Sequence, residues 1–208
     1  MNIGAFAMPP GRSSSNPHED RHSGACAPLE RCCLLAAGRG RRAGGPKAWL
    51  ASDGVPLIKR QLSFLTSLVS PEAVSVAVQE SWLERCRSLS PGTRFVAVDP
   101  EAPPLASLLA LLSDRPLEGW TSLHHVDMPV WEPALFEPPP EGDWEAAVWT
   151  RGGRGGHPVL LSESLRAEID RLDPSKDRLD RFLRGRRVLR RETALSCAFE
   201  NWNVGPTS

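Results

Sequence analysis

The sequence of 208 residues has no excess of charge of either sign, since 25 lysines and arginines balance 25 aspartates and glutamates. Without a basic field there is no reason to expect nucleic acid as a partner. Paired cysteines are also lacking, because the five cysteines are odd in number and include no C-x-x-C pair. Neither a disulfide framework nor a zinc site is expected, and a reduced, cytoplasmic setting fits best.

Long apolar runs are absent as well. No stretch reaches the roughly 18 consecutive apolar residues of a membrane helix, and no apolar segment of signal-peptide length is present, so no membrane partner is expected. Residues 1–29 are rich in proline, serine and charge. Such a segment buries too little apolar surface to offset the entropy lost on ordering, and it is predicted to be a disordered tail.

From residue 30 onward, apolar stretches alternate with helical spacing. Strands are predicted at 32–37, 74–78 and 95–98, with helices between them at 57–68 and 81–89. This order predicts one α/β domain over residues 30–208, in which a mainly parallel central sheet carries helices on both faces and forms three layers. The ligand crevice of such a sheet lies beyond the carboxyl ends of its strands.

A loop with four glycines, residues 38–45, follows the first predicted strand. Glycine lets a backbone turn sharply and approach a ligand closely, and exposed N–H groups form a concavity for anions. Positive charge comes from Arg39, Arg41, Arg42 and Lys47. The pattern indicates phosphate binding, with a solvated surface loop as the plainer alternative.

Two other phosphate loops do not fit these residues. A Walker A loop needs Gly-Lys followed by Ser or Thr, whereas Pro46 separates Gly45 from Lys47 and Ala48 follows. The dinucleotide pattern G-x-G-x-x-G/A is met, but the helix that should begin inside it would be interrupted by glycines and proline at 44–46.

The run from Leu34 to Lys47 resembles the signature L-A-A/G-G-x-[GS]-x-R-M-G-x-x-K of MobA-like nucleotidyltransferases, which include molybdenum cofactor guanylyltransferases and cytidylyltransferases. Arg42, Gly44 and Lys47 fall on its Arg, Gly and Lys, and Ala43 replaces the usual Met. The resemblance implies a Rossmann-like nucleotidyltransferase fold with Arg42 and Lys47 as catalytic residues. It implies nucleotide contacts for Leu35, Ala36, Ala37, Gly38, Gly40, Gly44, Lys47, Asp99 and Asp127.

An aspartate ends another predicted strand in the segment 123–129. Pro129 stops that strand, so the carboxylate of Asp127 is expected in the crevice. Mg²⁺ prefers hard oxygen ligands, and Asp127 is therefore predicted to hold it; the residue also matches the D-x-P metal site of the family that the glycine loop resembles. His124 and His125 are predicted to be strand residues that point to opposite faces.

Two further segments are similar to family elements in part. Residues 103–109 resemble a G-P-L-A-G step beside the nucleotide base, but Pro103 and Ser107 replace its glycines, and a helix start with proline in its first turn is the alternative. The Gly-His-Pro at 156–158 is similar to an acceptor-side element, which makes Gly156 and His157 candidate acceptor contacts. A flexible hairpin is the alternative there.

The end of the chain resembles the N-x-N-T-P element of the guanylyltransferase branch. By that match Asn203 would be the second oxygen ligand to Mg²⁺, and Asn201 a supporting polar contact on the acceptor side. Before it, residues 164–172 and 176–184 are predicted to be amphipathic helices with a solvated, charged face. The arginines at 184–191 form a local basic cluster that is expected in solvent, with phosphate binding as the alternative.

The resemblance implies transfer of a nucleoside monophosphate from GTP or CTP to a phosphate acceptor, with release of pyrophosphate and Mg²⁺ as cofactor. Molybdopterin is the family's commonest acceptor, and sugar or polyol phosphates are the nearest alternatives. A catalytically silent nucleotide-binding accessory protein is a further alternative. The protein is expected to be a monomer or a weak homo-oligomer.

Overall fold

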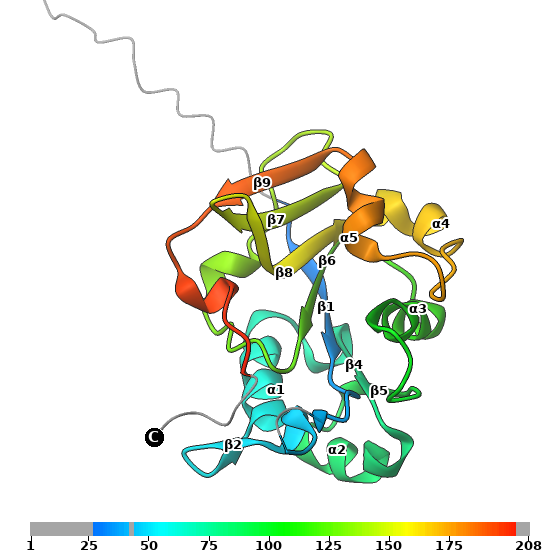
Figure 1. Cartoon of the computed structure of the whole chain (residues 1–208), viewed down its shortest axis with the longest axis vertical. Coiled ribbons are helices and arrows are strands. Elements are labelled where there is room, and N and C mark those ends of the chain that lie inside the picture. Colours follow the sequence, from blue (N-terminus) through cyan, green and yellow to red (C-terminus); the bar gives the residue numbers. More distant parts are fainter. Residues whose placement is uncertain (1–26, 42–43, 203–208) are drawn as a thin grey trace, which may run out of the picture.

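The structure is a computed structural model that describes residues 27–41 and 44–202. Its centre is a seven-stranded sheet with the strand order β5-β4-β1-β6-β8-β7-β9 (Figure 1). Strands β5, β4, β1 and β6 run parallel, β8 is antiparallel to both β6 and β7, and β9 is parallel to β7. The strands span Leu29–Leu35 (β1), Val74–Val78 (β4), Arg94–Ala97 (β5), Trp120–His125 (β6), Ala146–Arg151 (β7), Arg154–Ser162 (β8) and Val188–Glu192 (β9).

Helices cover both faces of this sheet, as predicted. On one face lie α1 (Leu57–Leu68) and α2 (Leu83–Leu89). On the other lie α3 (Pro104–Asp114), α4 (Arg166–Ile169) and α5 (Leu179–Phe182). A short antiparallel pair, β2 (Ala51–Ser52) and β3 (Val55–Pro56), precedes α1. The three-layer α/β architecture is therefore confirmed.

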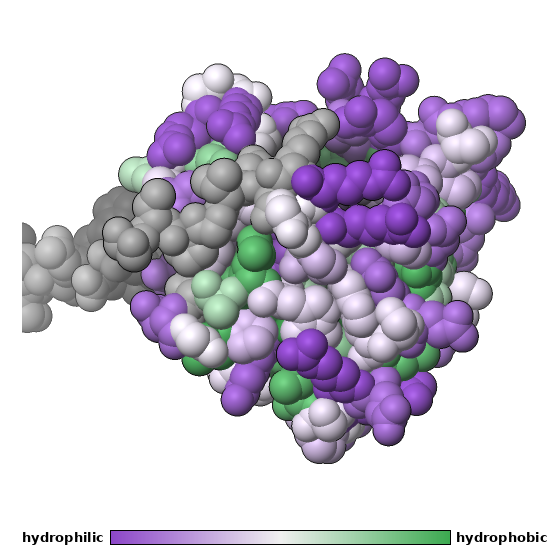
Figure 2. All heavy atoms as spheres, turned by 60° about the horizontal axis from the view of Figure 1, so that its bottom comes forward, coloured by the Kyte–Doolittle hydropathy of each residue, from purple (hydrophilic) through white to green (hydrophobic). Residues whose placement is uncertain are grey.

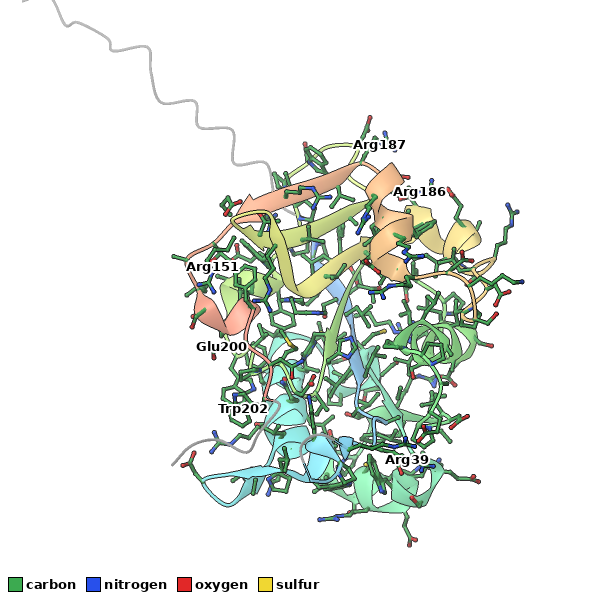
Figure 3. The ribbon with its side chains drawn as sticks, viewed as in Figure 1. Arg39, Arg151, Arg186, Arg187, Glu200 and Trp202 are labelled. Carbon is green, nitrogen blue, oxygen red and sulfur yellow. The ribbon has the colours of Figure 1, made fainter. Side chains whose placement is uncertain are left out.

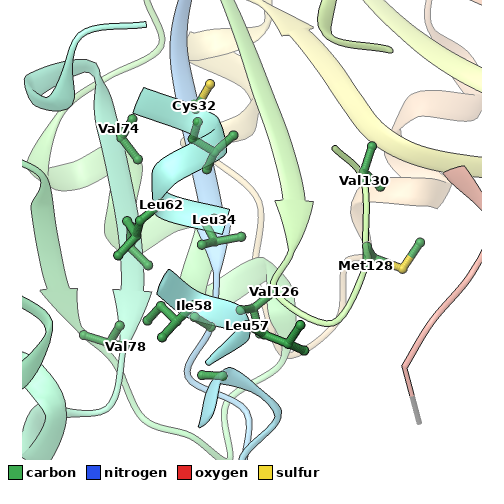
Figure 4. Close-up of a cluster of buried hydrophobic side chains, with 14 of the residues drawn as sticks. Cys32, Leu34, Leu57, Ile58, Leu62, Val74, Val78, Val126, Met128 and Val130 are labelled. Atoms are coloured by element: carbon green, nitrogen blue, oxygen red, sulfur yellow. The ribbon is translucent and has the colours of Figure 1, made fainter. Parts of the chain in front are cut away.

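Alternation along β1 divides the core into two clusters. Cys32 and Leu34 point into the cluster beneath α1, whereas Cys33 and Leu35 point into the cluster beneath α3. Figure 4 shows the first cluster, where Leu34 packs beside Ile58 and Leu62. Because β1 is central and buried on both faces, the loop that follows it starts from a fixed position.

The first strand begins earlier than predicted. Leu29 already pairs with Trp120 of β6, so ordered sheet starts one residue inside the segment that we expected to be a tail. Residues 1–26 of that tail lie outside the described residues. The strand ends at Leu35 rather than at residue 37, and the backbone N–H of Ala36 still donates to the carbonyl oxygen of Ala77 at 2.9 Å.

The charged segment before the last strand is less helical than predicted. The helix expected at 164–172 ends at Ile169, and the one expected at 176–184 begins only at Leu179. Asp173 explains the gap, because its carboxylate accepts the backbone N–H of Ser175 at 2.9 Å, while its own N–H donates to Asp177 at 2.8 Å. Such local bonds compete with the helix.

Strand β9 was not predicted. Its sequence is rich in arginine, and the strand lies at the edge of the sheet beside β7, where charged residues remain exposed on one side. No helix in the described part of the chain is long and apolar enough to cross a membrane. On the face that Figure 2 presents, the visible atoms are mostly hydrophilic, and the hydrophobic ones lie in small separate areas.

Candidate active site

A cavity of about 580 Å³ opens beyond the carboxyl ends of the parallel strands. Its walls come from the end of β1 and the glycine loop, from the loops after β5 and β6, and from the start of α3. This is the place where ligands of open parallel sheets bind. Seven of the predicted site residues line it, namely Leu35, Ala37, Gly38, Gly40, Lys47, Asp99 and Asp127.

The glycine loop closes on itself. Gly40 has a φ of +59°, and its carbonyl oxygen accepts the N–H of Gly45 at 3.3 Å. A Cβ on Gly40 would lie 1.9 Å from the carbonyl oxygen of Gly45, so only glycine fits there. Gly44 also has a positive φ, of +73°. The predicted catalytic Arg42 lies between them, outside the described residues.

Ala36 differs from its neighbours. Its side chain is 1 % exposed and belongs to the core beneath α1, whereas Leu35 and Ala37 line the cavity. Ala36 is thus placed as a support for the loop and does not line the cavity.

Three residues from distant parts of the chain meet beside this cavity, and two of them, Lys47 and Asp127, line it. Lys47 begins the short helical turn Lys47–Trp49, Asp127 follows β6, and Asn201 lies near the end of the described chain. The Lys47 Nζ atom donates to Oδ2 of Asp127 at 2.5 Å and to Oδ1 of Asn201 at 3.0 Å. The side chains of Lys47 and Asp127 are only 16 % and 13 % exposed, so water screens this ion pair weakly.

The segment that carries Asn201 is fastened to the sheet. The N–H of Trp202 donates to the carbonyl oxygen of Asp127 at 2.9 Å, and the Trp202 ring packs edge-on against Trp131. Figure 3 shows Arg151, Glu200 and Trp202 along one side of the molecule. Asn201 is therefore held beside Asp127, while the predicted metal ligand Asn203 lies outside the described residues.

Gly156 of β8 makes room for this segment. A Cβ there would lie 2.6 Å from the carbonyl oxygen of Ala198 and 2.7 Å from the Phe199 ring. Arg154 also donates to the carbonyl oxygen of Phe199 at 3.2 Å. Gly156 thus supports the position of the terminal segment, in addition to lining the second cavity described below.

An acidic residue that the sequence did not point to joins two sides of the first cavity. Glu101 accepts from Nε of Arg39 at 2.7 Å and from Nη2 of Arg41 at 2.8 Å (Figure 3 labels Arg39). Its N–H donates to Oδ1 of Asp99 at 2.8 Å. Only a weak feature of the sequence indicated this role. Glu101 is a lone carboxylate two residues after Asp99, and its charge is opposite to that of the arginines in the glycine loop.

A second, larger cavity of about 1280 Å³ adjoins the first. Both are lined by Leu35, Pro104 and His125, so they meet at these residues. Gly156 and His157 line the second cavity. Its outer wall comes from α5, the preceding loop and β9, including Lys176, Asp177, Arg178, Asp180, Arg184, Arg190 and Glu192.

The charged residues of this outer wall are exposed, as expected for a solvated face. They also border a cavity, which we did not expect of residues 176–180. A sequence of alternating positive and negative residues looks the same whether its helix faces only solvent or also borders a cavity. The charge pattern also does not reveal the turn at Asp173 that redirects the chain. A hairpin, which we gave as the alternative for the second glycine-rich segment, joins β7 and β8 at Gly152 and Gly153.

The side chains of His124 and His125 point to opposite faces of the sheet, as predicted. His124 points into the core, where its Nε2 lies 3.2 Å from Oε1 of Gln61, and burial lowers its pKa to about 3. His125 lines both cavities, and its ring packs edge-on against His157 with the centroids 5.3 Å apart. Burial lowers the pKa of His125, and it lowers that of His157 to about 4. Both rings are neutral at pH 7 and form an uncharged polar wall.

Nothing in the described chain gathers three or more histidine, cysteine or acidic side chains as a metal cluster. The oxygens of Asp127 and Asn201 nevertheless converge on one cation, the ammonium of Lys47. Hard oxygen donors of this type suit Mg²⁺ or Mn²⁺. The donor set present therefore fits a divalent cation.

Solved structures share this fold. A nucleotidyl transferase from Methanothermobacter is 23% identical with a TM-score of 0.66, covering 84% of this chain and 91% of its own. Molybdopterin-guanine dinucleotide biosynthesis protein A from Archaeoglobus fulgidus is 17% identical with a TM-score of 0.59, covering 84% and 92%. Rv0371c from Mycobacterium tuberculosis, in complex with manganese, is 22% identical with a TM-score of 0.58, covering 83% and 94%.

None of the curated proteins matches the chain. Residues 32–194 match the family described as the MobA-like NTP transferase domain. This range runs from β1 past the end of β9 and includes the glycine loop, Lys47, Asp99 and Asp127. Because the match spans well over half of the 208 residues, the chain belongs to the MobA-like NTP transferase family.

Proposed function

We propose that this protein transfers a nucleoside monophosphate from GTP or CTP to the phosphate of molybdopterin, in molybdenum cofactor biosynthesis. An acceptor phosphate oxygen attacks the α-phosphorus and forms a new P–O bond. The bond between the α-phosphorus and the bridging oxygen breaks, and pyrophosphate leaves with its electron pair. The observation that carries the proposal is the pairing of Lys47 with Asp127 at 2.5 Å on the floor of the glycine-loop cavity.

The residues around the first cavity suit a triphosphate. Backbone N–H groups of the loop 38–45 would cradle the phosphates, and Arg42 and Lys47 would neutralise charge that develops on the leaving pyrophosphate. Asp99 would contact the base or ribose. Phosphoryl chemistry of this kind depends on positioning and charge neutralisation, so no serine, cysteine or histidine nucleophile is needed.

Asp127 and Asn203 would hold Mg²⁺, with Asn201 beside them. The convergence of the Asp127 and Asn201 oxygens on an ammonium supports a cation at this position. When bound, the ion would supply positive charge to phosphate oxygens of donor and acceptor. The manganese complex of the structural relative Rv0371c also supports a divalent cation.

The second cavity supports a large acceptor. At about 1280 Å³ it exceeds the roughly 300–1,000 Å³ of common ligand pockets, and it joins the first cavity beside His125. Sugar or polyol phosphates, the nearest alternative acceptors, would leave much of it unfilled. Gly156 and His157 would contact the acceptor on the inner wall. The size of the cavity therefore favours molybdopterin.

A catalytically silent nucleotide-binding protein is the second candidate, and one observation favours it. Pro103 caps α3 and Ser107 is 6 % exposed, so the backbone beside the base site is helical where relatives are expected to have glycine. Such a protein would bind a nucleotide without turnover.

A thermal-shift panel of GTP, CTP, ATP and UTP, each with and without Mg²⁺, tests nucleotide binding. A ligand at a hundred times its Kd adds about 2.7 kcal/mol, which should raise the Tm by roughly 5–10 °C. A Mg²⁺-dependent shift with GTP or CTP, together with pyrophosphate release when molybdopterin is added, is expected. A shift without pyrophosphate release would favour the silent protein.

A further inference from the structure

The ammonium of Lys47 occupies the position of a bound cation. It lies between two oxygens that come from the loop after β6 and from the terminal segment, Oδ2 of Asp127 at 2.5 Å and Oδ1 of Asn201 at 3.0 Å. Both members of the ion pair are largely buried. The positive end of Lys47 thus neutralises the carboxylate that is the best candidate to hold a metal.

The two ligand residues are fixed, whereas the lysine is the part that can move. Asp127 is tied to Trp202 through its carbonyl oxygen, and the preceding residue, Val126, donates its N–H to the carbonyl oxygen of Leu35 at 3.0 Å. Lys47 carries its charge on a flexible four-carbon stem. Lys47 is therefore the member of this site whose charge can be moved by side-chain rotation.

A divalent cation and this ammonium cannot share the site without strong repulsion. A second positive charge held by the Asp127 carboxylate would lie beside the Lys47 ammonium in a weakly screened cavity, where like charges repel strongly. Lys47 would therefore have to leave the carboxylate of Asp127 before that carboxylate could hold a metal.

We propose that Lys47 and the divalent cation are alternative occupants of one oxygen site, and that the nucleotide exchanges them. This inference rests on the proposed function, because a triphosphate in the same cavity offers Lys47 a second anionic partner. Without nucleotide, Lys47 keeps the metal out. With nucleotide, Lys47 turns to the phosphates and the metal binds, so metal and nucleotide strengthen each other's binding.

The test is the affinity for Mn²⁺ without nucleotide, measured by electron paramagnetic resonance of the free ion. Lys47→Met should bind Mn²⁺ at least about tenfold more tightly than the wild type, because a competing charge is removed. Lys59→Met removes an equal charge from an exposed position on α1 and should leave the affinity unchanged. The gain should disappear in the double variant Lys47→Met/Asp127→Asn.

Lys47→Gln is a second variant that keeps a long polar side chain without charge, and it should show the same gain. Equal or weaker Mn²⁺ binding by the folded Lys47 variants would overturn the inference. So would a gain that survives Asp127→Asn. The proposed function is judged separately by nucleotidyl transfer in the wild type, which can succeed even where the Mn²⁺ result overturns this exchange.

Discussion

The Nζ atom of Lys47 lies 2.5 Å from Oδ2 of Asp127, although the two residues are 80 positions apart in the sequence. One follows the glycine loop after β1 and the other follows β6, and these two strands are neighbours in the sheet. Parallel pairing brings their carboxyl ends to one edge. The pair therefore follows from the strand order and joins the glycine loop to the candidate metal ligand.

Removing either partner should abolish turnover and leave the fold intact. Lys47→Ala and Asp127→Ala should each lower kcat/KM at least about 100-fold, since Lys47 would neutralise charge on the reacting phosphates and Asp127 would hold the metal ion. Circular dichroism should be unchanged, because both side chains lie on loops at the edge of the sheet. Lys59→Ala is the control and should keep full activity. Wild-type turnover in Asp127→Ala would refute the assignment of that residue.

Two glycines of the phosphate loop should respond differently to alanine. Gly40→Ala should weaken nucleotide binding at least about tenfold, because its positive φ and the 1.9 Å approach of its Cβ to the carbonyl oxygen of Gly45 force the loop to change shape. Gly45→Ala meets no atom within 4 Å and should bind nearly as the wild type does. Titration with GTP and CTP measures both, and equal affinities would contradict the described loop geometry.

The contact of β8 with the terminal segment gives a second matched pair. Gly156→Ala should push Ala198 and Phe199 away and displace Asn201, lowering kcat roughly 10- to 100-fold. Gly155→Ala has open space around its Cβ and should have little effect. If steady-state assays find that the two variants are equally active, the terminal segment does not position the site.

Stability should fall in mild acid because of His157, a half-buried ring on the wall of the second cavity. The pKa of His157 is lowered by burial from 6.5 to about 4, so the unfolded chain takes up a proton before the folded chain does. Its stabilising contribution is therefore complete above pH 6.5 and is lost as the pH falls toward 4.

Urea unfolding at pH 7 and pH 5 measures this loss. His157→Gln should lose roughly 2 kcal/mol less than the wild type between these two pH values. An equal loss in both proteins would mean that His157 is not buried as a neutral ring.

Local pattern was sufficient for much of the fold. The spacing of Leu57, Leu62, Leu65 and Leu68 predicted α1 and its buried side; the first three are buried, and Leu68 in the last turn is partly buried. The alternation at His124 and His125 predicted their opposite faces. Each of these follows from a short stretch of sequence whose periodicity is set by backbone geometry.

The parts that could not be predicted depend on distant contacts. The link from Glu101 to Arg39 and Arg41 joins two loops that only the folded sheet brings together. Likewise, β9 forms because β7 offers an edge for pairing, which its arginine-rich sequence does not indicate. The outer wall of the second cavity follows from both this pairing and the turn at Asp173.

The central claim is that Asp127 and Lys47 serve transfer of a nucleoside monophosphate. The most direct measurement supplies GTP or CTP labelled at the α-phosphate, with molybdopterin and Mg²⁺, and follows the label by chromatography. We expect the label to pass into a molybdopterin dinucleotide with one pyrophosphate released per transfer, and Asp127→Asn to abolish it while Asp143→Asn, a change at an exposed residue, does not. Label that stays in the mononucleotide pool with both nucleotides, or equal transfer by Asp127→Asn, would contradict the account.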